Sequence, residues 1–320
     1  MTKKPMFFEV GRKLYDAFIR PTPAVQVPSE YVGIVQQAMQ KVGWKTQVTG
    51  VDIGGAVGAP LDSNNRVAVA LSGGLDSVYL MHTLIDQGYA VTAVHVAGLN
   101  KFSGKYEEQA ARQAAAKAGA KFVKAVFNAP KQHFPDNPFK NQLVLSMMLD
   151  IGIKKGIYRF ALGSDWTTPL AEAVVGFTIT DSIEVNRAYW AGVRQRLPQA
   201  ELIFIPDSVK KVQRLAYLFD RGALADVSSC VSPLRFRQSL HERNEQKYGL
   251  HLMPNRCGSC YKCAMEYILL VETGRIPKNA KFYDHAWNTL ATSKTAHRPD
   301  LFAKSLPMKK RMENLLKYGS

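Results

Sequence analysis

The sequence predicts an α/β protein built on a doubly wound parallel sheet. Apolar runs at 67–71, 90–96 and 121–126 alternate with helix-patterned segments at about 75–88 and 106–118. Strands that alternate with helices in this way favour parallel pairing with helices on both faces. With 320 residues, 46% of them hydrophobic, the chain is long enough for one large domain with additions or for two domains.

The same pattern continues on both sides of this core. Two more strands are predicted at 158–162 and 202–206, and further helices at 31–39, beginning within 137–146, from 183 and from 209. Serines precede three of these helices as candidate N-caps, at Ser29, Ser182 and Ser208. In a sheet of this kind ligands bind beyond the carboxyl ends of the strands. The loops after Leu71, Val96 and Leu162 are therefore the candidate ligand loops.

The loop after the first of these strands carries the strongest motif. Ser72-Gly73-Gly74-Leu75-Asp76-Ser77 follows a β-run and opens a helix. Backbone N–H groups at such a turn, at the positive end of a helix, favour phosphate, and glycines allow close approach. The loop is neither a Walker A nor a G-x-G-x-x-G dinucleotide motif. A serine-capped turn without ligand is the alternative.

Further polar residues are candidates for the site. Gly163-Ser164-Asp165 ends a predicted strand, Lys140 and Asn141 lie in the segment 137–146 that begins a helix, and Asp181 and Ser182 precede another helix. Each has a simpler explanation. Gly163-Ser164-Asp165 could be an ordinary turn, and Lys140 could point into solvent. Asn141 could cap its helix, and either Asp181 or Ser182 could cap the next one.

The four cysteines predict a metal site. Cys257, Cys260 and Cys263 have the spacing C-x2-C-x2-C, and Cys230 lies upstream. Four thiolates suit tetrahedral zinc in a closed, structural site. An iron–sulfur cluster with the same ligands and unliganded buried cysteines are the alternatives.

Charge and composition limit the partners. The net charge of +16 attracts polyanions, of which nucleic acid is the obvious one; a charge that only aids solubility or attracts ATP is the alternative. No apolar run reaches the ~18 residues of a membrane span, so we expect no membrane partner. Crowded cysteines and the lack of an apolar leader favour a cytoplasmic protein without a signal peptide.

The Ser72–Ser77 loop resembles the pyrophosphatase loop of the N-type ATP pyrophosphatases (the PP-loop superfamily, of adenine nucleotide alpha hydrolase-like fold). The loop and the late cysteines together resemble one branch of it, 7-cyano-7-deazaguanine synthase, over most of residues 66–264. This resemblance implies adenylation of 7-carboxy-7-deazaguanine and attack by ammonia. The product would be an amide and then, in a second round with ATP, 7-cyano-7-deazaguanine, an intermediate of queuosine biosynthesis.

The resemblance also implies a site and cofactors: ATP, Mg²⁺ and structural Zn²⁺. Asp76, Ser77 and Lys140 are the expected catalytic residues, and Asp181 and Ser182 would read the base. The expected ATP-binding set is Ser72, Gly73, Gly74, Asp76, Ser77, Val96, Asn141, Gly163 and Asp165. The metal ligands are Cys230, Cys257, Cys260 and Cys263.

The chain departs from that family in ways that keep other acceptors open. Lys140 stands where the family has arginine, and 26 residues, many of them basic, separate Cys230 from Cys257. Coupling of the activated base to a protein amine, as in a branch found beside antiviral genes, is one alternative. A PP-loop enzyme that adenylates tRNA, or a nucleotide sensor without turnover, is another.

The expected organisation has four parts, and a homodimer is one open arrangement. An N-terminal extension (1–60) precedes the PP-loop domain (61–229). A zinc-binding region with a basic insert (230–264) and a C-terminal helical extension (265–320) follow, the last ending in a basic helix at about 309–317.

Overall fold

The computed structural model describes most of the chain in ten stretches. These are residues 6–19, 22–52, 65–99, 104–128, 139–163, 182–206, 208–228, 230, 234–254 and 256–292. The chain forms two compact units. Unit 1 contains residues 1–72, 80–104 and 118–205, and unit 2 contains residues 73–79, 105–117 and 206–320.

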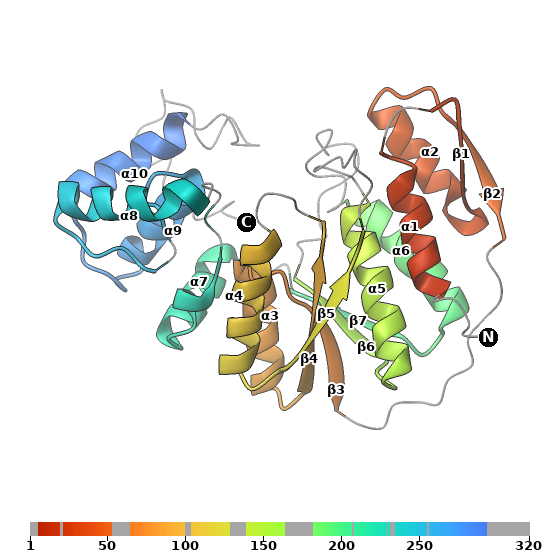
Figure 1. The fold of residues 1–320 in the computed structure, drawn as a ribbon, viewed down its shortest axis with the longest axis horizontal. Coiled ribbons are helices and arrows are strands. Elements are labelled where there is room, and N and C mark those ends of the chain that lie inside the picture. Colours follow the sequence, from red (N-terminus) through yellow and green to blue (C-terminus); the bar gives the residue numbers. More distant parts are fainter. Residues whose placement is uncertain are drawn as a thin grey trace. The chain divides into compact units, whose positions relative to one another are not determined.

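Unit 1 is built on a five-stranded parallel sheet (Figure 1). Its strands are β3 (Arg66–Ala70), β4 (Ala90–Ala97), β5 (Lys121–Val126), β6 (Arg159–Leu162) and β7 (Glu201–Phe204). Their order is β5-β4-β3-β6-β7. The chain thus starts in the centre and winds out to both edges, which confirms the predicted doubly wound sheet.

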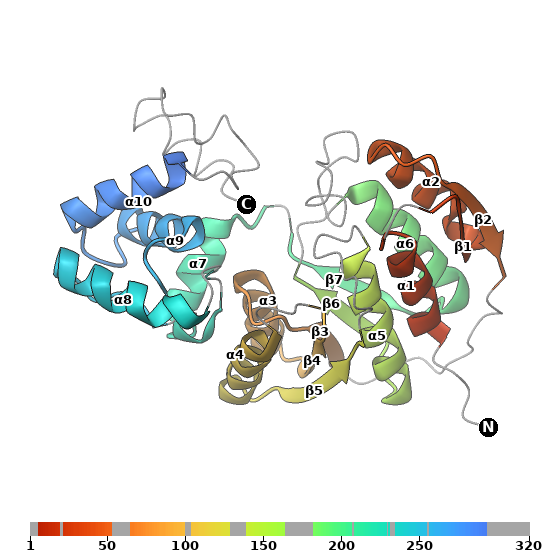
Figure 2. The ribbon, with the colours of Figure 1, turned by 45° about the horizontal axis from the view of Figure 1, so that its top comes forward.

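The apolar composition of the central strand explains its position. Val67, Ala68 and Val69 are fully buried in β3, as expected for a strand covered on both faces. Helix α5 (Lys140–Lys154) packs against β3, β4 and β6. Helices α5, α1 (Met6–Asp16) and α6 (Ile183–Arg196) lie on one side of the sheet (Figures 1 and 2).

The first fifty residues add to this unit. Helix α1 packs along α5, and the Asp150 carboxylate of α5 accepts hydrogen bonds from the N–H groups of Phe7 and Phe8 at 3.2 and 2.6 Å. Strands β1 (Ala24–Pro28) and β2 (Gln47–Val51) form a separate parallel pair.

The expected helix at 31–39 begins differently from the prediction. Ser29 opens a 3₁₀ turn, η1 (Ser29–Tyr31), and α2 (Val32–Lys41) follows with Tyr31 in the cap position and no side-chain cap. Ser29 as its N-cap was wrong, because the turn takes up the residues that a cap would need.

Unit 2 is helical. It contains α7 (Lys211–Asp220), the 3₁₀ turn η4 (Leu224–Asp226), α8 (Leu234–Tyr248), α9 (Tyr261–Glu272) and α10 (Ala280–Thr292). Helix α9 packs against both α7 and α10, and Figure 2 shows α8, α9 and α10 side by side. Helix α4 (Gly104–Lys117) lies almost wholly in this unit, and α3 (Leu75–Asp86) begins in it.

Helix α7 also begins later than predicted. Lys210, not Ser208, occupies its cap position, and the Gln213 side chain accepts the Lys210 N–H at 2.6 Å. The predicted basic helix at 309–317 lies outside the described residues. Among the helices that are described, none has the length and apolar character needed to cross a membrane.

Candidate functional site

The phosphate-loop motif forms a tight turn whose geometry requires glycine. Gly73 has φ +82°, and a Cβ there would lie 3.1 Å from the Ala111 nitrogen and 3.2 Å from the Glu107 oxygen. Both contacts are with backbone that cannot move aside cheaply. Helix α3 starts two residues later, and the Val78 N–H donates to the Gly74 carbonyl at 3.0 Å. The motif therefore has the strand–turn–helix setting that the sequence predicted.

The carbonyl groups of the turn are held by hydrogen bonds within unit 2. The Ser228 N–H donates to the Gly73 carbonyl at 2.7 Å, and the Ser77 hydroxyl donates to the Gly74 carbonyl at 3.1 Å. Because the carbonyls are held this way, the turn keeps one conformation. Gly73, Gly74, Asp76 and Ser77 thus come together within a single turn.

The structure adds a residue that the sequence analysis missed. Arg214 of α7 places Nη1 2.9 Å from Oδ1 of Asp76. Nε and Nη2 of the same guanidinium donate to the Val209 carbonyl at 3.2 and 2.9 Å. The arginine side chain is 3% exposed and the aspartate 32%, so a buried cation holds a carboxylate that still reaches solvent. No local pattern signals this pair, since 138 residues separate its members.

In unit 1, three predicted ligand loops leave neighbouring strands at one edge of the sheet. Ala70 pairs with Val94 and Leu162, so the ends of β3, β4 and β6 are adjacent, as the parallel arrangement predicted. Val96 is half-buried near the end of β4, and Gly163 follows β6 directly. The buried His95 ring helps fix this edge, with Nδ1 2.9 Å from the Leu71 carbonyl.

Four more of the predicted site residues lie in the described part of the chain. Ser72 is exposed at the end of the first stretch of unit 1, and Lys140 and Asn141 are half-buried in the first turn of α5. Asn141 as N-cap was wrong, because Phe139 occupies that position. Ser182 caps α6, its hydroxyl accepting the Val185 N–H at 3.4 Å. Asp165 and Asp181 lie outside the described residues.

The four cysteines converge on one point in unit 2. Their sulfurs all lie within 4.8 Å of one another, with Sγ···Sγ distances of 3.9 Å for Cys257–Cys263, 3.9 Å for Cys230–Cys260 and 3.4 Å for Cys260–Cys263. Tetrahedral ligands about 2.3 Å from one ion would be roughly 3.8 Å apart. The arrangement therefore fits a single metal ion.

The protein around the thiols suits a bound ion as well. The Ser259 N–H points at the Cys257 sulfur at 3.3 Å, and Arg237 Nη2 donates to the Cys230 carbonyl at 2.9 Å. Neighbouring thiols, Cys230 first among them, raise the pKa of Cys263 strongly. Thiols packed this closely gain from a cation, which removes their protons and joins them.

An ion pair lies beside the cluster. Arg256 Nε donates to Glu266 Oε2 at 2.6 Å, and both side chains are under 7% exposed. Although burial alone would lower it, the pKa of Arg256 is raised, chiefly by the Glu266 carboxylate. Arg256 Nη1 also donates to the Val227 carbonyl at 2.6 Å. Val227 directly precedes Ser228, whose N–H is bonded to Gly73. The segment Val227–Ser228 therefore contacts both the ion pair beside the cluster and the phosphate loop.

Comparisons with known proteins match part of the chain. A family model described as "tRNA methyl transferase HUP domain" matches residues 65–150. The tRNA-specific 2-thiouridylase MnmA of Treponema denticola is 46% identical over 63 residues, which are 18% of this chain and 17% of the relative. The chain thus spans about a sixth of the length of that relative.

A solved structure is similar more distantly. The U34-tRNA thiolase NcsA of Methanococcus maripaludis, with its [4Fe-4S] cluster, covers 66% of this chain and 72% of its own, at 16% identity and TM-score 0.37. A likeness at this level gives no information about the function or the metal centre of this chain.

The comparisons support the superfamily that the sequence predicted but not the particular branch of it. The thiouridylase is a tRNA-modifying enzyme, and nothing in these matches singles out the 7-cyano-7-deazaguanine synthases. Together the parallel sheet, the glycine turn and the match over residues 65–150 establish an α/β HUP domain of the PP-loop superfamily.

Proposed function

We propose that this protein is a PP-loop enzyme that uses ATP to adenylate a carbonyl oxygen of a tRNA base. The observation that carries the proposal is the match of residues 65–150 to the tRNA methyl transferase HUP domain. The 46% identity to the tRNA-specific thiouridylase over 63 residues supports it. The net charge of +16 supports a polyanionic substrate.

In the proposed reaction the base carbonyl oxygen attacks the α-phosphorus of ATP, and pyrophosphate leaves. A nucleophile then replaces AMP at the activated carbon. The N–H groups of the Gly73–Gly74 turn and the start of α3 would stabilise the departing pyrophosphate. Asp76, oriented by Arg214, would hold Mg²⁺ against the phosphates, and Ser77 would add a hydroxyl donor.

The cysteine content bears on the nucleophile. The sequence contains four cysteines, and all four lie in the cluster. Residues that fill a closed site have no spare thiol to carry sulfur, so the incoming nucleophile would come from outside this chain. We propose zinc as the ion, with a structural role: it would fasten α9 to the segment around Cys230.

A second function has one observation in its favour. A single cysteine followed by C-x2-C-x2-C, after a phosphate loop, resembles the 7-cyano-7-deazaguanine synthases. In that case 7-carboxy-7-deazaguanine takes the place of the tRNA base, and ammonia or a protein amine is the acceptor.

Pyrophosphate release from ATP tests the two functions side by side. The protein is incubated with an unmodified tRNA transcript pool, with 7-carboxy-7-deazaguanine plus ammonium, or with neither. Release that requires tRNA and disappears in Asp76→Ala supports the first proposal. Release that requires the deazaguanine instead overturns it in favour of the second.

A further inference from the structure

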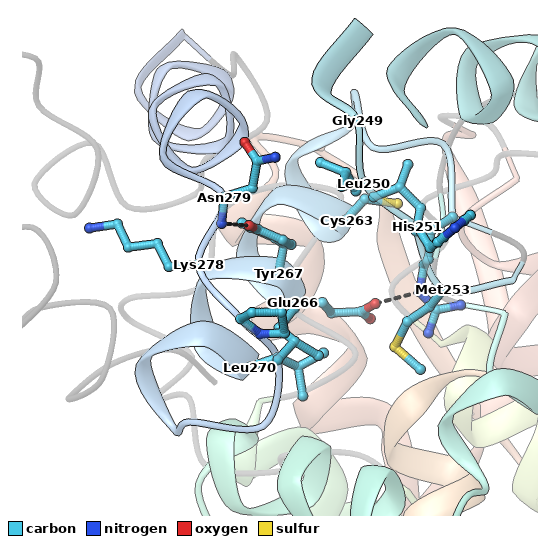
Figure 3. A pocket seen from close by; sticks show the side chains of 14 residues that line it. Gly249, Leu250, His251, Met253, Cys263, Glu266, Tyr267, Leu270, Lys278 and Asn279 are labelled. Atoms are coloured by element: carbon cyan, nitrogen blue, oxygen red, sulfur yellow. Dashed lines mark hydrogen bonds and ion pairs between the residues drawn. The ribbon is translucent and has the colours of Figure 1, made fainter. Parts of the chain in front are cut away.

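A cavity of about 540 Å³ lies in unit 2, lined in part by Cys263 of the cysteine cluster (Figure 3). The phosphate loop does not contribute to its lining. One face of α9 forms its wall. Cys263, Glu266, Tyr267 and Leu270 recur at helical spacing and all line it. The loops before α9 and α10 complete the lining.

The interior of this cavity is apolar with a neutral polar floor. Leu250, Met253 and Leu270 line the walls. The charges of Arg256 and Glu266 offset each other at 2.6 Å, and the Tyr267 hydroxyl already accepts the Asn279 N–H at 2.9 Å. An interior of this kind favours a flat, uncharged heteroaromatic group over an ion.

The rim of the cavity, unlike its interior, is polar and exposed. His251 and Lys278, both exposed, line it. Asn279 caps α10, its side chain accepting the Phe282 N–H at 3.0 Å, so the positive end of that helix faces the same loop. Glu245, 3.6 Å from the His251 ring, offsets part of this charge.

The end of α8 also contacts the loop before α10. The Asn279 side chain donates to the Tyr248 carbonyl at 2.7 Å, and the exposed Lys247, one residue before Tyr248, places its ammonium 5.0 Å from the centroid of the Tyr248 ring. The wider segment agrees: residues 206–320 contain 20 Lys and Arg against 10 Asp and Glu. A cationic rim around an apolar chamber is complementary to a nucleotide, with its phosphate outside and its base inside.

We propose that this cavity binds one unpaired nucleotide of an RNA strand, at a position other than the base that reacts. The base would enter between Met253 and the Tyr267 face of α9, while its flanking phosphates would lie against Lys278 and the first turn of α10. The choice of RNA rests on the proposed function. The cavity, its lining and its charges do not.

RNA binding by the full chain tests the proposal with three variants. Met253→Trp fills the chamber without changing charge. Lys278→Ala removes one cation from the rim, and Arg243→Ala removes an exposed arginine of α8 that does not line the cavity. The probes are a fluorescein-labelled single-stranded RNA and an unmodified tRNA transcript, with affinity measured over a series of salt concentrations.

Each variant has a different expected result. Met253→Trp should weaken binding about tenfold with an unchanged salt slope, because it blocks a base and not a phosphate. Lys278→Ala should weaken binding about threefold and reduce the salt slope by about one. Arg243→Ala should stay within about twofold of the native protein. Native affinity in Met253→Trp would overturn the proposal.

Crosslinking of the native protein gives a second test that needs no variant. RNA containing 4-thiouridine should crosslink to the segments 249–254 or 276–279, and crosslinks that fall only elsewhere contradict the proposal. Loss of these crosslinks with excess mononucleotide would assign the cavity to a free nucleotide and would also contradict it.

The outcomes separate this proposal from the proposed function. If tRNA drives pyrophosphate release in the native protein and in Met253→Trp alike, with equal affinity, the cavity proposal fails and the function stands. If the native protein binds no RNA even at low salt, both fail.

Discussion

Arg214 and Asp76 form an ion pair between α7 and the start of α3, with 2.9 Å between Nη1 and Oδ1. The guanidinium is anchored by the Val209 carbonyl, so it holds the carboxylate in one orientation. This pairing gives the motif aspartate a fixed geometry before any phosphate binds.

The first prediction concerns this arginine. Arg214→Gln should lower the rate of pyrophosphate release about tenfold or more, because a charge-assisted contact to Asp76 is lost. The rate of Arg214→Lys should lie between those of the native protein and Arg214→Gln. A lysine keeps the charge but lacks the planar guanidinium that contacts both Asp76 and Val209. Steady-state kinetics with Mg-ATP as the varied substrate measures the effect.

The matched control lies at the end of the same helix. Arg221 is exposed and lies against the Tyr217 ring; Arg221→Gln should keep native kinetics. Equal losses in the two variants would mean that α7 contributes only general stability, and the positioning role of Arg214 would be rejected.

The second prediction concerns the backbone of the phosphate loop. Gly73→Ala should destabilise the fold by about 2–3 kcal/mol, since it adds strain at positive φ to a clash with α4 backbone. Gly222→Ala, also at positive φ but with open space around it, should cost only about 1–2 kcal/mol. Urea unfolding measures both, and an equal cost would show that the close approach at Gly73 adds nothing.

The third prediction concerns the metal. The purified protein should contain about one zinc per chain and no iron or labile sulfide, because four sulfurs within 4.8 Å of one another are spaced to bind one ion. A four-iron cluster binds each cysteine through a different iron and needs wider spacing. Elemental analysis with visible absorbance decides between them, and a brown protein would contradict the prediction.

Loss of that ion should unfold part of unit 2. Cys260→Ala or a strong chelator should lower the melting temperature by several degrees or more. Ser259→Ala, which changes a neighbour of the ligands that bonds Asn244 at 2.8 Å, should retain the metal. An unchanged melting temperature in Cys260→Ala would show that the cluster does not stabilise the fold.

The fourth prediction concerns pH. Burial raises the pKa of Asp150 above its ordinary value, against the opposing effect of the Phe8 and Phe7 N–H groups. The folded state therefore holds this proton more tightly than the unfolded one. The resulting stability is full below the unfolded pKa of about 4 and is lost as pH rises through the folded pKa.

Asp150→Asn removes this titration while keeping an acceptor for α1. The free energy of unfolding of the native protein minus that of the variant should therefore fall as pH rises from about 4. Urea titrations at several pH values measure the difference. A difference that grows with pH would show that the N–H bonds from α1 outweigh the burial.

The sequence predicted what local patterns can specify. Period and composition identified all five strands of the main sheet, because a doubly covered strand such as β3 must be almost wholly apolar. The spacing of Cys257, Cys260 and Cys263 predicted for a similar reason that these thiols converge, since C-x2-C geometry is local.

Features that depend on distant contacts were not predictable in this way. Arg214 reads as an ordinary helix residue until α7 brings it to Asp76. Ser29 fits the pattern of an N-cap, and only the 3₁₀ turn to Tyr31 displaces it. The cavity is formed by one face of α9 and by the loops before α9 and α10. In the sequence, the apolar residues of that helix face cannot be told from ordinary core residues.

The most direct measurement of the central claim is the transfer of AMP itself. The protein is incubated with ATP labelled at the α-phosphorus and with unmodified tRNA transcripts, without added nucleophile. The products are then separated under denaturing conditions. Adenylation of a tRNA base predicts label on RNA with the native protein and none with Asp76→Ala. Unlabelled RNA, together with labelled AMP bound to 7-carboxy-7-deazaguanine when that base is supplied, would contradict it.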